Sequence, residues 1–131
     1  MTKEKDPVYD RGLALRKEVL GEHYVKNAMD DAWTFDADFQ ELIVKHVWGT
    51  VWARPNLSYR DRSFLNIAMI AALNRPNQLE AHLKGALNNG LTPDEIKEIF
   101  IQVSAYCGMP AGIECFKIAR KVFEELGVDC D

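Results

Sequence analysis

Apolar residues recur every three or four positions along most of the chain, which is the spacing of one face of an α-helix. The alternating runs of β-branched residues that indicate strands are missing from the sequence. The pattern predicts helices over residues 8–20, 36–53, 64–73, 76–89, 93–107 and 110–126. Because the connections are short, we expect an all-α fold, a compact orthogonal or bundle-like array of about six helices.

Several of these helices carry chemical signals at their ends. Ser58 stands three residues before Asp61, which is the spacing of a capping box at a helix start. Thr92 and Glu95 have the same spacing, with a proline at the first helical position between them. Gly90 suits the left-handed position that follows a helix end. Local chemistry therefore predicts a helix start at Ser58, a stop at Gly90 and a new start at Thr92.

Two of the predicted helices are unusual in what they bury. The segment 64–73 (FLNIAMIAAL) is apolar on nearly every side, which predicts a central, buried helix. On the helix 76–89, Leu79 and Leu83 belong to an apolar stripe, and His82 lies among its members. A titratable imidazole in that position is a hydrogen-bonded core residue, a metal ligand or a proton donor.

Composition and charge narrow the class of protein. The chain of 131 residues is 47% apolar and 27% charged, which is typical of one globular domain, here spanning residues 1–131. A net charge of −4 argues against non-specific nucleic-acid binding, and no run approaches the roughly 18 apolar residues of a membrane helix. The N-terminus shows no secretory signal and three cysteines are too few for a disulfide framework, so we expect a cytoplasmic protein.

Basic residues gather in one central segment of this acidic chain. They are Arg54, Arg60, Arg62 and Arg75. Such a cluster suits recognition of a small anionic molecule, although solvated charges at helix ends would give the same pattern. The sequence leaves both interpretations open.

Other common chemistries lack their motifs. The histidines His23, His46 and His82 show no metal-binding spacing, so we expect no metal. No C-x-x-C or G-x-S-x-G motif occurs, which argues against a dithiol enzyme and a triad hydrolase. Cys107 and Cys115 lie on either side of a helix break and Cys130 lies in a frayed tail, so we expect buried, inert thiols rather than a redox pair.

Trp48 and Trp52 lie one helical turn apart in the segment 36–53. Packing in the core or in an interface explains such a pair, and so does a wall of a flat pocket. The spacing does not separate these alternatives.

Four motifs indicate a family. They are W-G-x-x-W-x-R-P from Trp48, the R-S pair at Arg62, L-x-x-H-L-x-x-A-L-N-N-G from Leu79 and Y-x-G-x-P-A from Tyr106. In this combination the chain resembles the carboxymuconolactone decarboxylase family of the alkylhydroperoxidase-D-like superfamily, over almost its whole length. The resemblance implies that superfamily's all-α fold and a ring-shaped homo-oligomer, a trimer or hexamer.

The redox branch of the same superfamily carries the motif C-x-x-C-x-x-x-H. When this chain is aligned on His82, Arg75 and Gln78 occupy the two cysteine positions, and Ser63 replaces the glutamate of that branch. A thiol peroxidase mechanism therefore has no nucleophile here. An arginine in place of a thiolate suits an anionic substrate instead.

The resemblance implies decarboxylation of 4-carboxymuconolactone to 3-oxoadipate enol-lactone, in the β-ketoadipate pathway of protocatechuate catabolism. The lactone carbonyl accepts the electron pair that remains on the substrate when CO₂ leaves, so no cofactor is needed. By the same resemblance His82 is the general acid, whereas His46, on the apolar face of its own helix, is the alternative. The predicted substrate-binding residues are Arg62, Arg54, Arg75, Trp48 and Tyr106. A relative acting on another lactone and a non-catalytic oligomeric scaffold remain the competing interpretations.

Overall fold

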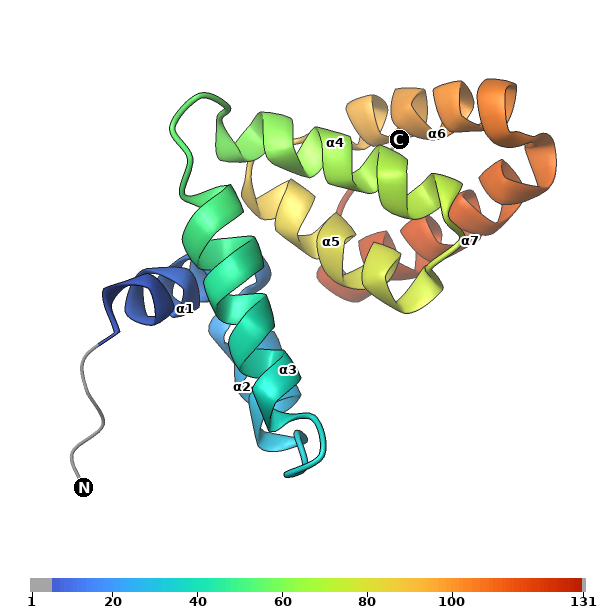
Figure 1. Cartoon of the computed structure of the whole chain (residues 1–131). Helices are drawn as coiled ribbons and strands as arrows, with labels where there is room; N and C mark the ends of the chain where they lie inside the picture. The colour runs from blue at the N-terminus through green and yellow to red at the C-terminus, as the bar shows by residue number, and fades with distance from the viewer. Residues whose placement is uncertain (1–5, 131) are drawn as a thin grey trace. The chain divides into compact units, whose positions relative to one another are not determined.

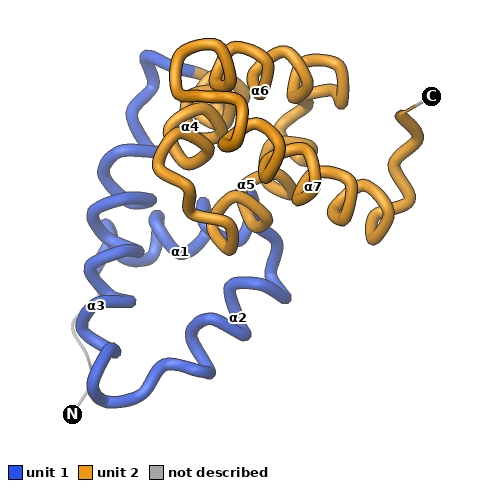
Figure 2. The backbone as a smooth tube through the Cα atoms, turned by 90° about the vertical axis from the view of Figure 1, so that its right-hand side faces the viewer, with its two compact units in different colours: residues 1–57 blue, residues 58–131 orange. Residues whose placement is uncertain are grey.

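The structure is a computed structural model that describes residues 6–130, and its regular structure there is entirely helical. The elements are α1 (Pro7–Leu20), α2 (Glu22–Asp30), α3 (Ala37–Leu42), the π-helix η1 (Ile43–Trp52), α4 (Tyr59–Ala72), α5 (Pro76–Asn88), α6 (Pro93–Cys107) and α7 (Met109–Leu126) (Figure 1). The predicted all-α class is confirmed. The chain divides into two compact units, residues 1–57 and 58–131 (Figure 2), which are described separately below.

Two elements of the first unit differ from the sequence prediction. α2 was not predicted; it has nine residues and buries only Val25. The single helix predicted over 36–53 is α-helical only to Leu42 and continues as the π-helix η1. A π-helix bonds i to i+5, and the apolar spacing of this segment does not reveal that change of register.

Close backbone packing between α1 and η1 organises the first unit. A Cβ atom added to Gly12 would lie 2.1 Å from the carbonyl oxygen of Val44 and 2.8 Å from the backbone nitrogen of Gly49. The Arg11 side chain donates two hydrogen bonds to the Gly49 carbonyl, of 3.0 Å from Nε and 2.6 Å from Nη2. Glycine at both positions therefore lets the two helices approach at backbone distance.

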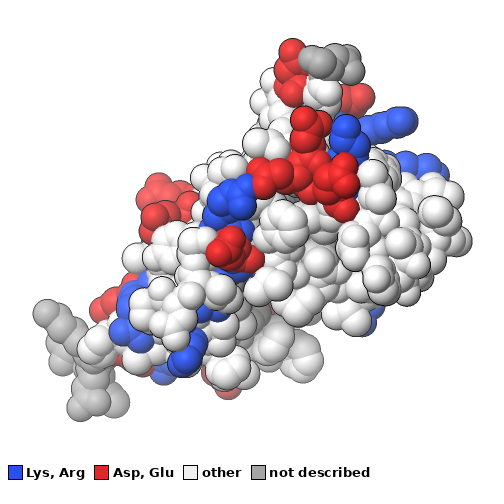
Figure 3. Space-filling view, turned by 90° about the horizontal axis from the view of Figure 1, so that it is seen from above, with Lys and Arg blue, Asp and Glu red and all other residues white. Residues whose placement is uncertain are grey.

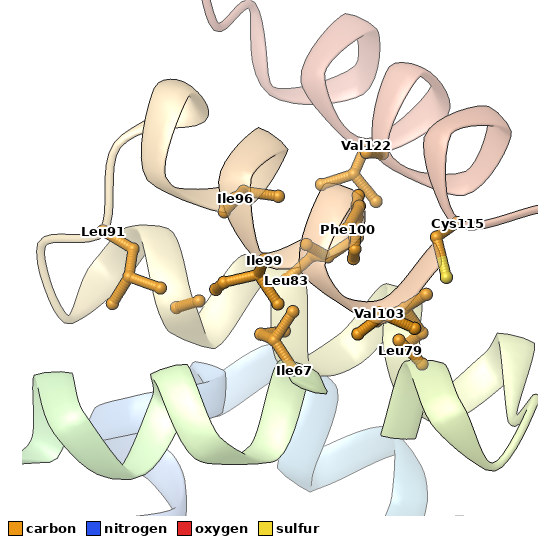
Figure 4. Close-up of a cluster of buried hydrophobic side chains, with 13 residues drawn as sticks. Ile67, Leu79, Leu83, Leu91, Ile96, Ile99, Phe100, Val103, Cys115 and Val122 are labelled. Carbon is orange, nitrogen blue, oxygen red and sulfur yellow. The ribbon is translucent and has the colours of Figure 1, made fainter. Parts of the chain in front are cut away.

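The second unit is a bundle of α4, α5, α6 and α7, in which α4 and α7 each pack against both α5 and α6. Its core takes side chains from all four helices, as Figure 4 shows for Ile67, Leu83, Phe100 and Val122. These four side chains are completely buried. Each of the four helices thus contributes one apolar face to the core of this unit.

The capping signals read from the sequence are confirmed. Ser58 Oγ accepts a hydrogen bond from the backbone of Asp61, and Thr92 and Glu95 form a complete capping box. Gly90 has φ of 95°, and the backbone N–H groups of residues 90 and 91 bond back to the last turn of α5. The ends of these helices are therefore determined by residues within a few positions of each end.

The prediction of a central, fully buried helix over 64–73 is wrong. Only Ser63, Ile67 and Ala71 of α4 are buried, whereas Leu65 and Met69 are 50% and 54% exposed. The reason is that α4 packs inside the second unit with one face only. Its opposite face remains apolar and uncovered among the described residues.

Candidate active site

His82 lies on α5, which starts at Pro76 and turns its buried stripe toward the core of the second unit. The stripe contains Leu79, Leu83 and Ala86, and His82 stands about 60° to one side of it around the helix axis. His82 is accordingly half-buried rather than enclosed. The imidazole therefore lies at the edge of the apolar core, where it borders the helix flank.

The two flanks of α5 face different neighbours. On one flank Glu80 lies 3.3 Å from Lys121 of α7, and Lys84 lies 3.4 Å from Glu125 of α7. On the other flank Asn89, at the end of the helix, donates hydrogen bonds to Ser63 Oγ (2.8 Å) and to the Tyr59 carbonyl (3.4 Å) of α4.

His82 belongs to the second of these flanks. It precedes Asn89 by seven residues, which is two helical turns, so the two side chains lie on the same side of α5. The Asn89 bond to Ser63 fixes that side as the one that faces α4. His82 therefore lies on the flank of α5 that borders α4.

Polar side chains of α4 line the same border. Asn66 follows Ser63 by three residues and Arg62 precedes Asn66 by four, and both are half-buried. The Nε atom of Arg62 is inaccessible to solvent. We call the group Arg62, Asn66, His82 and Asn89 the α4–α5 polar border. The structure thus places the predicted acid His82 and the first-choice arginine Arg62 on adjoining flanks of two packed helices.

Arg75 lies at the turn between α4 and α5. Asn74 has φ of 56°, and the backbone N–H groups of residues 74 and 75 bond to the carbonyls of Ala71 and Ile70, so α4 ends in a Schellman motif. The Arg75 guanidinium donates a 3.0 Å hydrogen bond to the Leu73 carbonyl. It also lines a cavity of about 200 Å³ whose other lining residues are Ile70, Ala71, Asn74, Pro76, Leu79, Glu114, Cys115 and Ile118.

Three other predicted residues lie in the first unit. Arg54 is exposed directly after η1, and His46 is exposed on η1, contrary to the prediction that it lies on the apolar face. Trp48 is only 2% exposed and stacks on Trp52 with 4.7 Å between ring centroids. The stacked, buried pair agrees with the interpretation that the two tryptophans pack in the core. A role of Trp48 in substrate binding stays a prediction.

Two further predicted residues lie in the second unit with His82. Tyr106 is 82% exposed near the end of α6. Arg60, a member of the basic cluster, is bonded to Glu95 of α6. The Arg60 charge is therefore balanced by a carboxylate within the bundle.

The cysteines differ from the prediction of buried thiols. Cys107 and Cys130 are exposed, and only Cys115 is buried. Burial, and secondarily the charge of Glu114, raises the pKa of the Cys115 thiol. All three are free thiols.

The sequence analysis overlooked three polar residues that the structure singles out. Asn66 and Asn89 lie on the α4–α5 polar border. The spacing of one helical turn between Arg62 and Asn66 could have predicted that Asn66 lies on the same flank as Arg62. Arg16 of α1 is 5% exposed and donates a 3.0 Å bond to Gln40, and burial lowers its pKa. Arg16 sits within an ordinary amphipathic pattern, so the sequence offers no signal for it.

Residues 6–130 contain neither a membrane-spanning helix nor a cluster of metal ligands. No helix in this range is long and apolar enough to cross a membrane. In the same range no three or more His, Cys, Asp and Glu side chains are grouped so that they could hold a metal ion.

Comparison with known proteins places the chain in a family. The sequence profile of the carboxymuconolactone decarboxylase family matches residues 37–121. The chain is 42% identical to the 4-carboxymuconolactone decarboxylase of Acinetobacter baylyi over 92% of its own length and 90% of the relative. It is 40% identical to the nitrosuccinic acid decarboxylase npaB of Metarhizium robertsii over 91% of its length and 83% of that relative. A 4-carboxymuconolactone decarboxylase sequence of Pseudomonas putida is 37% identical over 31% of this chain and 85% of its own length.

The chain therefore belongs to the carboxymuconolactone decarboxylase family. The predicted resemblance is confirmed, and so is the class of enzyme, a decarboxylase. The catalytic and substrate-binding residues stay predictions.

Proposed function

We propose that the protein catalyses the decarboxylation of 4-carboxymuconolactone to 3-oxoadipate enol-lactone without a cofactor, as a step of protocatechuate catabolism in the β-ketoadipate pathway. The observation that carries the proposal is the 42% identity, over nearly the whole of both chains, to a 4-carboxymuconolactone decarboxylase. The half-buried His82 and Arg62 on adjoining flanks of two packed helices support it.

The chemistry explains why the side chains of the protein suffice. The departing carboxylate is attached to the γ-carbon of an unsaturated lactone. When CO₂ leaves, its electron pair moves through the double bond into the lactone carbonyl and forms a dienolate. A proton added at the α-carbon then gives the enol-lactone. The enzyme has to orient the substrate, stabilise the developing oxyanion and deliver that proton.

In this scheme His82 protonates the dienolate. Imidazole titrates near neutral pH, so it can hold and release a proton there. The half-buried position of His82 beside Leu79 and Leu83 limits the access of water, which strengthens hydrogen bonds to a developing negative charge. Asn66 is a polar residue on the same border, whereas Asn89 lies two helical turns from His82 and bonds to Ser63.

An arginine holds the carboxylate that the substrate retains. Arg62 is our first choice because it lies on the flank of α4 that adjoins the flank of His82, and a guanidinium can bind a carboxylate through two parallel hydrogen bonds. Arg54 is the alternative, and Arg75 takes this role only if the cavity that it lines admits a dicarboxylate. Trp48 and Tyr106 are proposed to line the pocket of the flat ring.

The protein is further proposed to form a ring-shaped homo-oligomer. The exposed apolar residues of α4 and its C-cap support an oligomer, because Leu65, Met69 and Leu73 are each at least half exposed. Figure 3 shows one face of the molecule, on which Lys, Arg, Asp and Glu leave an area uncovered. Neighbouring exposed apolar side chains such as these three are typical of protein–protein interfaces.

A second candidate substrate is nitrosuccinate, favoured by the 40% identity to a nitrosuccinic acid decarboxylase. Nitrosuccinate bears a carboxylate on the carbon that carries the nitro group. Loss of CO₂ sends the electron pair into the nitro group as a nitronate, which again needs a proton on carbon. Both substrates are dicarboxylates whose own functional group accepts the electrons, so one site chemistry would serve either.

The test is to mix purified protein with freshly generated 4-carboxymuconolactone, and separately with nitrosuccinate, and to follow CO₂ release. His82→Gln should lose about 10²–10⁴-fold in kcat. The matched control is His23→Gln, because His23 is exposed on α2 and its recorded partner is Asn27. Urea unfolding of both variants separates a catalytic role from a structural one.

If the protein released CO₂ from nitrosuccinate but not from the lactone, nitrosuccinate would replace the lactone as the proposed substrate. An active His82→Gln variant with native stability would refute the proton-donor role. Failure to release CO₂ from either compound would reject the proposed function.

A further inference from the structure

Two residues of opposite charge, Arg75 and Glu114, line the cavity at the turn between α4 and α5, and both are exposed at its rim. They form no ion pair with each other or with any other side chain of residues 6–130. They come from different helices, Arg75 from the start of α5 and Glu114 from the first turns of α7. The remaining walls are mainly apolar, with Ile70, Leu79 and Ile118 among them.

Local structure holds Arg75 in place. The Schellman motif at the end of α4 returns the backbone of residue 75 to the carbonyl of Ile70, and the guanidinium bonds to the Leu73 carbonyl. The Arg75 guanidinium donates no other hydrogen bond within the described part of the chain, so its other N–H groups are available to a ligand. A guanidinium that is already oriented loses less entropy when it binds a carboxylate.

Glu114 gives the same cavity a negative side. Cys115, the next residue in the chain, is a buried part of the cavity wall; burial raises the pKa of its thiol, and the neighbouring Glu114 charge raises it further. A ligand with one carboxylate can place it at Arg75 and its uncharged body along the apolar wall. A second carboxylate would lie in a space of about 200 Å³ that it shares with Glu114, where like charges repel.

We propose that this cavity is a binding site for small monocarboxylates and that Glu114 makes it reject dicarboxylates. Its volume equals that of about six or seven liquid water molecules, which suits a compact ring of roughly ten non-hydrogen atoms. His82 does not line the cavity, so this site is described apart from the α4–α5 polar border. If the proposed function holds, the ligand is the product, because decarboxylation turns a dicarboxylate into a monocarboxylate.

Binding is measured by calorimetry with two stable probes at pH 8, 2-furoate and furan-2,5-dicarboxylate, with furfuryl alcohol as the uncharged analogue. Wild-type protein should bind 2-furoate at least about five-fold more tightly than either other compound. Arg75→Gln should weaken 2-furoate about five- to ten-fold. Glu114→Gln should tighten the dicarboxylate about three- to five-fold and 2-furoate by a smaller factor, because the single carboxylate at Arg75 lies farther from Glu114. Lys117→Gln and Glu124→Gln are the matched controls, since these exposed α7 residues do not line the cavity.

The position of the ligand is read from Cys115. In a Cys107→Ser, Cys130→Ser background, 2-furoate should slow the reaction of Cys115 with a small thiol reagent, and fresh enol-lactone should do the same. Both results would support the site and its product assignment. Protection by 2-furoate without protection by the lactone would overturn the product assignment.

Three results would overturn the site itself: no 2-furoate binding at 10 mM (about the millimolar limit of weak ligands), equal affinity for the dicarboxylate, or no effect of Glu114→Gln. These measurements need no turnover. If the protein decarboxylates but gives one of these three results, only the proposed cavity site is rejected. If the protein is inactive but binds the probes as expected, only the proposed function is rejected.

Discussion

Gly12→Ala tests the close contact between α1 and η1. A Cβ atom at position 12 would lie 2.1 Å from the Val44 carbonyl oxygen, 2.8 Å from the Gly49 nitrogen and 3.0 Å from the Gly49 Cα atom. All three are backbone atoms, so no side-chain rotation relieves the overlap. Ordinary contact begins near 3.4 Å, so the two helices must separate by roughly 1 Å.

The magnitude follows from two opposing effects. Alanine in place of glycine favours a helix by about 1 kcal/mol. Overpacking of this kind costs about 1–3 kcal/mol, and here the cost is at the upper end because the neighbours are backbone and the displaced helices carry the core around Leu15 and Trp48. We expect Gly12→Ala to lower the free energy of unfolding of the first unit by about 1–2 kcal/mol, opposite in sign to its helix propensity.

The assay is urea unfolding followed by tryptophan fluorescence, because Trp33, Trp48 and Trp52 are the tryptophans of the chain and all lie in the first unit. Ala14→Gly is the control, since Ala14 is exposed on the same helix and reports the propensity effect alone. A Gly12→Ala variant as stable as wild type, or more stable, would refute the packing argument.

Three further predictions concern single side chains. Thr92→Ala removes the capping box of α6 and should cost about 1 kcal/mol in thermal or urea unfolding, whereas Thr92→Ser should restore most of it; equal losses in both variants would contradict the capping role. The pKa of Asp6 is lowered, chiefly by the hydrogen bond from Lys45 and then by backbone hydrogen bonds. The stability that Asp6 contributes is therefore present above the ordinary carboxyl pKa and is lost as pH falls through the lowered pKa. Asp6→Asn should reduce the loss of stability below about pH 4 in unfolding curves, and an unchanged pH profile would contradict this. Cys107 should react with a thiol reagent at least about ten-fold faster than Cys115 at pH 8, because burial raises the pKa of the Cys115 thiol and hides it; comparable rates by mass spectrometry would contradict the buried position.

Much of the second unit could be predicted from local sequence. Helix α5 begins and ends almost as predicted, because Pro76 fixes its first turn and Gly90 adopts the left-handed conformation after its last. The apolar stripe that contains Leu79 and Leu83 was assigned correctly for the same reason, since helical periodicity alone decides it. These features depend on residues at most one or two turns apart.

The candidate site could be predicted only in part. His82 and Arg62 were chosen by their match to family motifs, and the structure adds that they lie on adjoining flanks of α5 and α4. The flank of His82 follows from the bond between Asn89 and Ser63, which joins residues from different helices. No periodicity within one helix contains that information.

The sequence by itself therefore determined the helical class, the caps at Ser58 and Thr92, and the family, because each depends on the chemistry of neighbouring residues or on motifs along the chain. Only the tertiary structure decided which face of α4 is buried and which charges share the cavity of Arg75 and Glu114. The physical reason is that helix packing directions arise from contacts between residues far apart in the chain, and these contacts leave no repeating pattern in the sequence.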